Sequence, residues 1–419
     1  MRNRSPSLRT AILTASLLSG LPTAAAAGAW SQPGHDASHS GFNASESTIS
    51  PENVNSLVRK WDFPTGSEVF FPVLDADNTI FALNLANQLF ALNPRTGAQL
   101  WSFNAGPTIA GGGMAIDSVH RKAFVLCSID AQHSGVCALD AKTGATLWTW
   151  AIYKEGTVDV GSSPYNPPVV KDGLVFVGES DTASFSHVGY FVALNEQDGT
   201  LVWSRGNCGN TGHNYCNFIG SNPAAVANGF VIYDTGYEGS PYAAVCAVSE
   251  SSGMLAWCFP SLQENVDNHA PSVADKLVFL AETDSNANSE FFALSLKTGA
   301  VRWSYSVNDG NGANRYFPAA AANGVVYFEA GGSPTIFAFD EKHGGAPTWQ
   351  TTTPGDTGIS VANGVLYGWA QPNLFALDAQ TGSPLWDYPT DIRNATPFVE
   401  NGSLFATCGI NDVCAFGLP

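Results

Sequence analysis

Ten polar side chains lie in segments that should connect one strand group of this chain to the next, and together they could hold a ligand. Two of them, Arg315 and Arg393, stand out because only 18 of the 419 residues are Lys or Arg, and a guanidinium can clamp a carboxylate. Loops on a rigid scaffold often carry binding residues. Alternatively, these residues solvate loops, line a water-filled channel and form structural ion pairs. The set is Glu68, Asp159, His213, Asp267, His269, Asn314, Arg315, Tyr316, Asp356 and Arg393.

Two shorter patterns bring metal-ligating residue types together. His35 and His39 are four residues apart, but no helix is indicated around them, so we expect a strap on the surface of the fold rather than a metal site. A second segment lacks the glycine of an EF-hand loop, and a polar hairpin loop is the prediction there. Its alternating oxygen-bearing side chains are Asp284, Asn286, Asn288 and Glu290.

One phrase recurs seven times and must position these residues. It is an apolar alternating run, a polar turn ending in Gly, and a Trp shortly after that Gly, which together predict a hairpin. Spacings of 37 to 55 residues indicate an array of similar units, with each Trp docked between units. The copies end at Trp101, Trp148, Trp203, Trp257, Trp303, Trp349 and Trp386.

A second phrase precedes most copies and supplies another hairpin. Asn-Gly or Asp-Gly pairs separate two apolar runs at 172–173, 228–229, 323–324, 363–364 and 401–402. Two hairpins in each period make a four-stranded blade, so the predicted fold is an all-β propeller.

The two ends of the chain complete the blade count. The last unit lacks its outer Trp strand, and the segment LVRKWDF around Trp61 has the pattern of that strand without its own hairpin. We therefore predict an eight-bladed β-propeller over residues 57–419, with the last blade closed by an N-terminal strand.

The N-terminal segment predicts export. Three arginines precede an apolar stretch over 11–21 and a run of small residues ending at Ala27, which is the layout of a secretory signal peptide. We assign 1–27 to this signal and 28–56 to an N-terminal strap, and expect a secreted or periplasmic protein without a transmembrane segment.

The charge of the chain is strongly acidic. Its formal net charge is −18, and without the predicted signal 15 basic residues face 36 acidic ones. Such a field disfavours binding to nucleic acid or anionic membranes. It favours solubility outside the cell or, alternatively, attraction of a cation or basic partner.

Eight cysteines in an exported chain should be oxidised. Their clustering brackets short loops and hairpins, and no CxxC motif points to metal binding or thiol chemistry. The predicted disulfides join Cys127 with Cys137, Cys208 with Cys216, Cys246 with Cys258, and Cys408 with Cys414.

The repeated phrase A-L-D-x-x-T-G-x-x-x-W, best matched at 138–148 and 376–386, resembles the blade motif of quinoproteins, eight-bladed propellers that bind pyrroloquinoline quinone. The resemblance covers residues 57–419. The segments 30–43 and 49–61 also resemble the start of secreted proteins similar to polyvinyl alcohol dehydrogenases. Fold resemblance alone does not assign activity.

The resemblance implies roles for particular residues. In the family's dehydrogenases the quinone lies on the propeller axis beside Ca²⁺, and an Asp is the general base for the alcohol. Asn265 stands at the position of that Asp, so the candidates for the base are Asp267, two residues on, and Asp356, two blades later. Glu179 or Asp181 would hold calcium only in a different register. From the loop set named above, Arg315, Arg393, Tyr316 and Glu68 are the residues that we assign to the cofactor.

The sequence departs from that family pattern at three points. Ser184 stands where the calcium-binding Glu is expected, no two cysteines are consecutive, and there is no CxxCH motif for haem. Our first hypothesis is therefore a ligand- or protein-binding scaffold. The alternative is an alcohol dehydrogenase that depends on pyrroloquinoline quinone and Ca²⁺.

Overall fold

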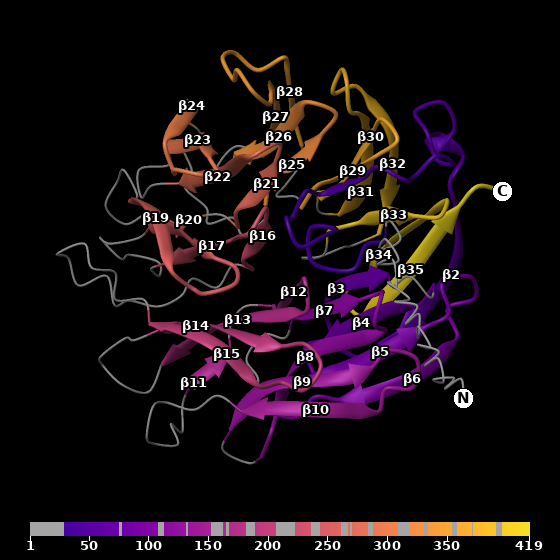
Figure 1. Ribbon diagram of the computed structural model, residues 1–419. Helices are drawn as coiled ribbons and strands as arrows, with labels where there is room; N and C mark the ends of the chain where they lie inside the picture. The colour runs from indigo at the N-terminus through magenta and orange to yellow at the C-terminus, as the bar shows by residue number, and fades with distance from the viewer. Residues whose placement is uncertain are drawn as a thin grey trace, which may run out of the picture.

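The predicted propeller is confirmed by the computed structural model (Figure 1), in which eight β-sheets stand as blades around a central axis. Besides strands, the described residues form one short 3-10 helix, η1 (Val54–Ser56). The structure describes residues 29–74, 78–107, 113–130, 133–151, 162–164, 167–181, 189–206, 223–235, 244–260, 267–268, 270–283, 288–308, 318–330, 334–353, 358–370, 372–390 and 396–419.

The first four blades follow one another along the chain, each running from its innermost to its outermost strand. Blade 1 has β3 (Val69–Leu74), β4 (Ile80–Asn84), β5 (Gln88–Leu92) and β6 (Gln99–Asn104). Blade 2 has β7 (Met114–Asp117), β8 (Lys122–Ser128), β9 (Ser134–Asp140) and β10 (Thr146–Ala151). Blade 3 has β11 (Ser162–Pro164), β12 (Val169–Lys171), β13 (Leu174–Asp181), β14 (Gly189–Asn195) and β15 (Leu201–Gly206). Blade 4 has β16 (Ala225–Ala227), β17 (Phe230–Thr235), β18 (Ala244–Ser249) and β19 (Leu255–Pro260).

The remaining blades continue in the same order around the ring. Blade 5 has β20 (Asp267–Asn268), β21 (Ser272–Ala274), β22 (Leu277–Thr283), β23 (Asn288–Ser295) and β24 (Val301–Asn308). Blade 6 has β25 (Ala320–Ala322), β26 (Val325–Ala330), β27 (Thr335–Asp340) and β28 (Trp349–Thr352). Blade 7 has β29 (Ser360–Ala362), β30 (Val365–Ala370), β31 (Asn373–Asp378) and β32 (Pro384–Pro389), with β1 (Phe42–Asn43) parallel to β29. Blade 8 has β33 (Phe398–Glu400), β34 (Ser403–Cys408), β35 (Asp412–Gly417) and β2 (Val58–Pro64).

The N-terminal strand closes the ring as the sequence predicts. Strand β2 pairs antiparallel with β35, so that Trp61 lies opposite Ala415. Two segments from the ends of the described chain thereby form one blade, and β2 covers the sheet edge that β35 would otherwise expose.

The repeated Trp residues dock between blades. In seven of the eight, the indole Nε1 donates a hydrogen bond of 2.7–3.1 Å to a main-chain carbonyl oxygen of the next blade. Trp386 is the exception. The third and fourth strands of blade 8, β35 and β2, come from opposite ends of the chain, so no turn of the repeated phrase joins them there. Trp386 packs instead against Phe416 and Tyr388.

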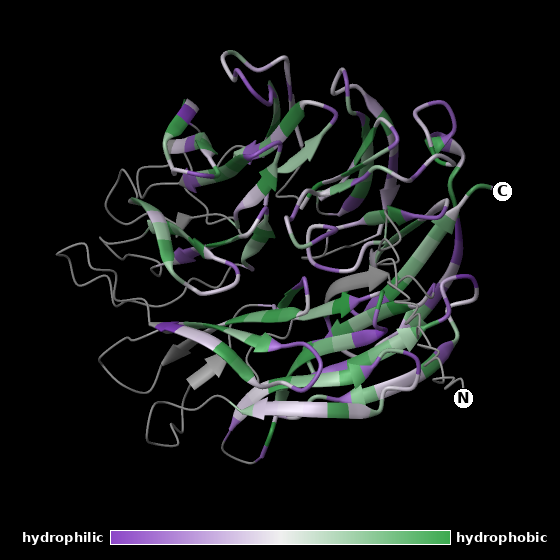
Figure 2. Ribbon diagram, in the orientation of Figure 1, coloured by the Kyte–Doolittle hydropathy of each residue, from purple (hydrophilic) through white to green (hydrophobic). Residues whose placement is uncertain are grey.

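The blade interiors are buried on both faces, because each sheet packs between two neighbours. The second strand of blade 1, β4, is buried at all five positions. Between blades 5 and 6 the rings of Phe291 and Phe328 stack 4.6 Å apart. Figure 2 accordingly shows hydrophobic colour concentrated on the middle strands of the blades. Near-continuous apolar runs in these strands follow from this two-sided burial.

Three of the four predicted disulfides are confirmed. They join Cys127 to Cys137, Cys246 to Cys258 and Cys408 to Cys414. The predicted pair of Cys208 and Cys216 lies outside the described residues. Within the described part of the chain, no helix is long and apolar enough to span a membrane.

Candidate functional site

The strand connections define two ends of the ring. In every blade with a described first turn, the innermost strand leads to the second strand at one end, which also carries the Gly turns of the repeated phrase. We call it the turn end. The outermost strand of one blade leads to the innermost strand of the next at the opposite end, the connection end. The Asn-Gly and Asp-Gly turns adopt positive φ at both residues, as the hairpin prediction requires.

Four of the eight predicted site residues lie in described segments, and all four lie at the connection end. Glu68 precedes β3, and its main-chain oxygen accepts a hydrogen bond from the Leu85 N–H. Glu179 and Asp181 occupy alternate positions at the far end of β13, and Asp267 begins β20. The topology thus brings acids from blades 1, 3 and 5 to one end of the ring.

The other predicted site residues are Arg315, Tyr316, Asp356 and Arg393, and they lie outside the described residues. Their roles remain predictions. The same holds for Ser184, for the other loop residues Asp159, His213, His269 and Asn314, and for Asp284 and Asn286 of the oxygen-rich hairpin.

Three buried acids near the connection end were not among the predicted site residues. Glu282, Asp234 and Glu329 sit at the ends of the second strands of blades 5, 4 and 6, and they are 1%, 4% and 9% exposed. Glu282 pairs with Asn268 of β20 just as Glu179 pairs with Pro164 of β11, so the two glutamates hold equivalent positions. The sequence signal for these acids is an Asp or Glu near the end of the apolar run that forms a second strand.

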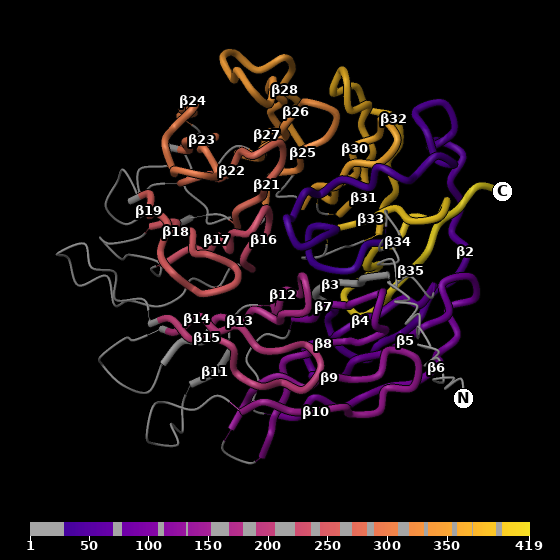
Figure 3. The backbone as a smooth tube through the Cα atoms, viewed as in Figure 1, coloured from indigo at the N-terminus to yellow at the C-terminus, as the bar shows by residue number. Residues whose placement is uncertain are grey.

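The N-terminal strap crosses the turn end of the central channel (Figure 3). Its main-chain oxygens accept hydrogen bonds from the innermost strands of blades 2, 4, 5, 6 and 7. Its side chains bond to the innermost strands of blades 3 and 8. The donor N–H groups belong to Ile116, Val226, Val273, Ala321 and Val361, and their acceptors are Ser31, Ala37, Ser38, Ser40 and Gly41.

Two amide side chains complete the strap contacts. Gln32 makes a two-way bond with Val170, donating from Nε2 to its oxygen at 2.8 Å and accepting its N–H through Oε1 at 3.0 Å. Asn43 donates from Nδ2 to the oxygen of Val399 and to Glu400 Oε2, both at 2.8 Å. These two side chains bind the strap to the innermost strands of blades 3 and 8.

Two strap residues have strongly shifted pKa values. Burial lowers the pKa of His39 to about 4, because the ring is fully buried and Nδ1 meets only the Pro271 oxygen at 3.2 Å. Burial acts to raise the pKa of Asp36, but bonding and charge from His35 and hydrogen bonds from Ser38 and Ser40 hold it well below its ordinary value. The turn around Asp36 is thus ordered by its own carboxylate.

A carboxyl pair locks the strap to blade 8. Glu46 accepts the N–H groups of Thr48, Ile49 and Gly402 at 2.6–3.0 Å. Burial, and then the charge of Glu46, raise the pKa of Glu400 to about 8. Glu400 is therefore mostly protonated at neutral pH.

A cavity of about 980 Å³ lies at the turn end, between the strap and the first turns of the blades. Carboxylates outnumber cations on its walls, so it offers a negative surface. The charged side chains in its lining are Asp36, Asp117, Asp172, Asp275, Glu341 and Lys171, with His35 and His120.

The chain is similar to known proteins of two kinds, an outer membrane protein assembly factor and a polyvinylalcohol dehydrogenase. The family model PQQ_2, described as outer membrane protein assembly factor BamB, matches residues 30–305 and 332–417. Polyvinylalcohol dehydrogenase of Sphingopyxis sp. is 22% identical over 400 residues, which cover 87% of this chain and 51% of that protein. Outer membrane protein assembly factor BamB of Moranella endobia is 25% identical over 292 residues, covering 65% of this chain and 64% of the relative. The chain thus spans less than two thirds of either relative.

A solved structure agrees with the fold. Quinohemoprotein alcohol dehydrogenase from Comamonas testosteroni aligns with a TM-score of 0.74 at 16% identity, over 93% of this chain and 80% of that one. At this identity the likeness supports the propeller architecture alone.

Proposed function

Since the chain belongs to the PQQ_2 family, described as outer membrane protein assembly factor BamB, we propose that it is an exported binding module that holds a small molecule or protein partner at its connection end. The observation that carries the proposal is the strap, which is hydrogen-bonded to the innermost strands of blades 2 to 8 and covers the turn end of the channel. A ligand on the propeller axis is then reached from the opposite face.

The rigidity of the ring supports a binding role. Seven indole hydrogen bonds join neighbouring blades and three disulfides join strands within a blade, so loops at the connection end start from fixed positions. Binding residues on loops need such a frame. The disulfides also suit an oxidising compartment, in accord with the predicted export signal.

Site-specific photocrosslinking in the source organism tests the binding proposal. A photoreactive residue at Glu68 or Asp267 reports on the connection end, whereas one at Leu147 or Met254, which are 49% and 70% exposed, reports on the blade periphery. We expect a discrete, saturable adduct from the first pair only. Equal adducts from both pairs, or none from the first pair, would contradict a connection-end site.

A second candidate is an alcohol dehydrogenase that uses pyrroloquinoline quinone and Ca²⁺, which the alignment with polyvinylalcohol dehydrogenase over 400 residues favours. Carboxylates at Glu179 and Asp181 are of the type that Ca²⁺ prefers. The bound quinone would supply the two-electron acceptor. This chain would supply a carboxylate, Asp267 or Asp356, to take the hydroxyl proton of the alcohol.

Reconstitution separates the two candidates. The purified full chain is dialysed against the quinone with and without Ca²⁺, then assayed for bound cofactor by absorbance and for dye reduction with methanol, ethanol, 1-butanol and polyvinyl alcohol. The dehydrogenase requires stoichiometric binding and a rate that falls at least tenfold in either D267N or D356N. If Arg315, Arg393, Tyr316 and Glu68 contact the cofactor, their alanine variants should bind it more weakly. The binding-module proposal predicts no dye reduction with any of these alcohols.

A further inference from the structure

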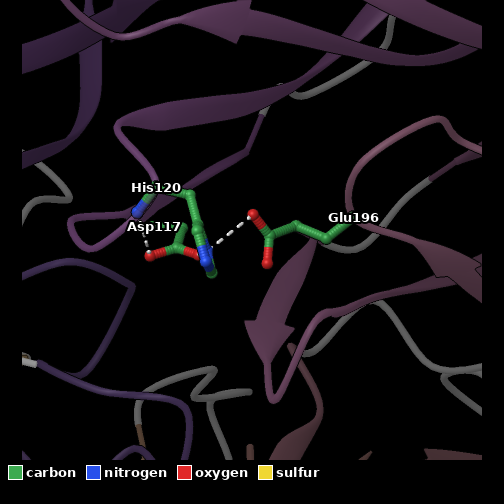
Figure 4. A group of neighbouring side chains, drawn as sticks. All are labelled: Asp117, His120 and Glu196. Atoms are coloured by element: carbon green, nitrogen blue, oxygen red, sulfur yellow. Dashed lines mark hydrogen bonds and ion pairs between the residues drawn. The ribbon is translucent and has the colours of Figure 1, made fainter. Parts of the chain in front are cut away.

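Three side chains of types that bind metal ions lie close together at the turn end, between blades 2 and 3 (Figure 4). Asp117 ends β7, His120 lies in the following turn, and Glu196 comes directly after β14. His120 Nδ1 is 2.6 Å from Asp117 Oδ2 and 3.2 Å from Glu196 Oε1. One ligand atom from each residue falls within 4.8 Å of the other two. This cluster lies at the opposite end of the ring from the proposed binding face, so it is independent of that proposal.

The turn that carries His120 is unusual among the blades. From blade 3 to blade 8 two residues join the innermost strand to the second strand, whereas four residues, 118–121, join β7 to β8. Asp117 Oδ1 accepts the N–H groups of Val119 and His120 at 2.7 and 3.1 Å, which orders this longer turn. The added length is what carries an imidazole toward the next blade.

Glu196 is buried and aimed at that imidazole. Its side chain is 2% exposed, and no hydrogen bond reaches Oε1 within the described chain, although His120 Nδ1 lies 3.2 Å and Lys122 Nζ 3.4 Å from it. The main chain is fixed because the N–H of Glu196 bonds to the Gly173 oxygen and its oxygen accepts the Trp148 indole. An ionisable oxygen held in place without a hydrogen-bond donor is costly unless a cation completes its surroundings.

The outer side of the cluster is open. The side chain of His120 is 52% exposed, and both His120 and Asp117 border the 980 Å³ cavity. A metal ion held by these residues would therefore keep a coordination position facing solvent, as in sites with three protein ligands.

We propose that Asp117, His120 and Glu196 form a site for a divalent transition metal ion, for which Zn²⁺ is the best match. One imidazole and two carboxylates are ligands that Zn²⁺ accepts, at about 2.0–2.2 Å each. Ligand atoms around such an ion are roughly 3.3 Å apart, so only small side-chain shifts are needed. The ion would link blade 2 to blade 3 beside the strap.

Lys122 is the competitor for this position. Its Nζ donates to the Glu196 main-chain oxygen at 3.0 Å and lies 3.4 Å from Oε1, so it already supplies one positive charge. Two carboxyl groups, those of Asp117 and Glu196, lie beside this one lysine. A dication with the imidazole and both carboxylates as ligands would therefore balance more charge than Lys122 does.

The chain supplies a matched control pair. Asp340 and His343 have the same spacing and a 2.8 Å contact between carboxylate and Nδ1, but the His343 side chain is 84% exposed and no third ligand joins them in the described chain. A metal that binds merely to exposed Asp and His pairs would treat both sites alike.

Calorimetric titration of the untagged full chain tests the proposal. The protein is stripped with EDTA, exchanged into chelator-free buffer at pH 7.5 and titrated with ZnCl₂. Co²⁺ serves as a visible-spectrum probe of coordination. We expect one equivalent in the wild type and in H343A, binding at least tenfold weaker in H120A and D117N, and tighter binding in K122M. Zn²⁺ should also raise the Tm of the wild type but not that of H120A.

Three results would overturn the site. They are no stoichiometric binding in the wild type, binding that survives H120A, and equal losses in H120A and H343A. His120 is half exposed, so H120A should keep the circular dichroism spectrum of the parent even if D117N does not fold.

Discussion

The indole ring of Trp148 lies directly on Gly199, the turn glycine of the next blade. A Cβ built on Gly199 would come within 2.6 Å of the ring carbon Cε3. The same indole donates through Nε1 to the Glu196 oxygen at 3.0 Å. The Trp of one copy of the repeated phrase thus packs on the Gly of the copy in the next blade.

The variant G199A should destabilise the protein by roughly 3 kcal/mol or more. Gly199 has a φ of +72°, which costs an alanine about 1 kcal/mol or more, and the added methyl would also displace Trp148. Urea unfolding followed by Trp fluorescence measures the loss. The control is G173A, because Gly173 has a φ of +80° but no atom within 4 Å of its Cβ position. Equal losses in both variants would mean that only the backbone conformation matters.

These contacts explain which parts of the structure were predictable. Trp148 and Gly199 belong to a pattern with a fixed period, so the sequence alone predicts the blades and the ring. The strap bonds are made mainly by backbone oxygens, such as that of Ser38 to Val273, which no residue pattern announces. Likewise His120 and Glu196 are far apart in sequence and meet only through blade packing, so the sequence analysis missed them.

The variant Q32A should loosen the strap and cost about 2–4 kcal/mol of unfolding free energy. It removes both partners of the buried Val170 main chain, and each buried polar group left without a partner costs about 1–3 kcal/mol. Urea unfolding gives the energy, and hydrogen exchange should show lost protection at Val170. The matched control N93A removes a half-buried turn amide, whose oxygen accepts the N–H groups of Arg95 and Thr96 at the surface. A loss no larger than that of N93A would show that the strap contact carries no stability.

Protonation of His39 should weaken the fold in mild acid. Its pKa is about 4 in the folded protein against an ordinary 6.5, so the unfolded chain binds the proton more readily. Stability from this residue is complete above pH 6.5 and falls by about 3 kcal/mol as the pH drops to 4. The variant H39N, which stays neutral and tolerates the φ of +54°, should lack this loss. The measurement is the difference in unfolding free energy between the two proteins across this range, and a constant difference would contradict the prediction.

Glu400 should act in the opposite direction. Its pKa is about 8 in the folded protein against an ordinary 4.5, so folding favours the protonated acid. The stability that it contributes is complete below pH 4.5 and declines by roughly 4 kcal/mol as the pH rises to 8. The variant E400Q keeps an oxygen for the Asn43 amide and carries no charge, so it should match the wild type near pH 4.5 and exceed it at pH 8. Glu52 is exposed, so E52Q controls for the loss of one negative charge from this acidic chain. If E52Q stabilises at pH 8 as much as E400Q, the gain comes from net charge and not from the buried pair that locks the strap.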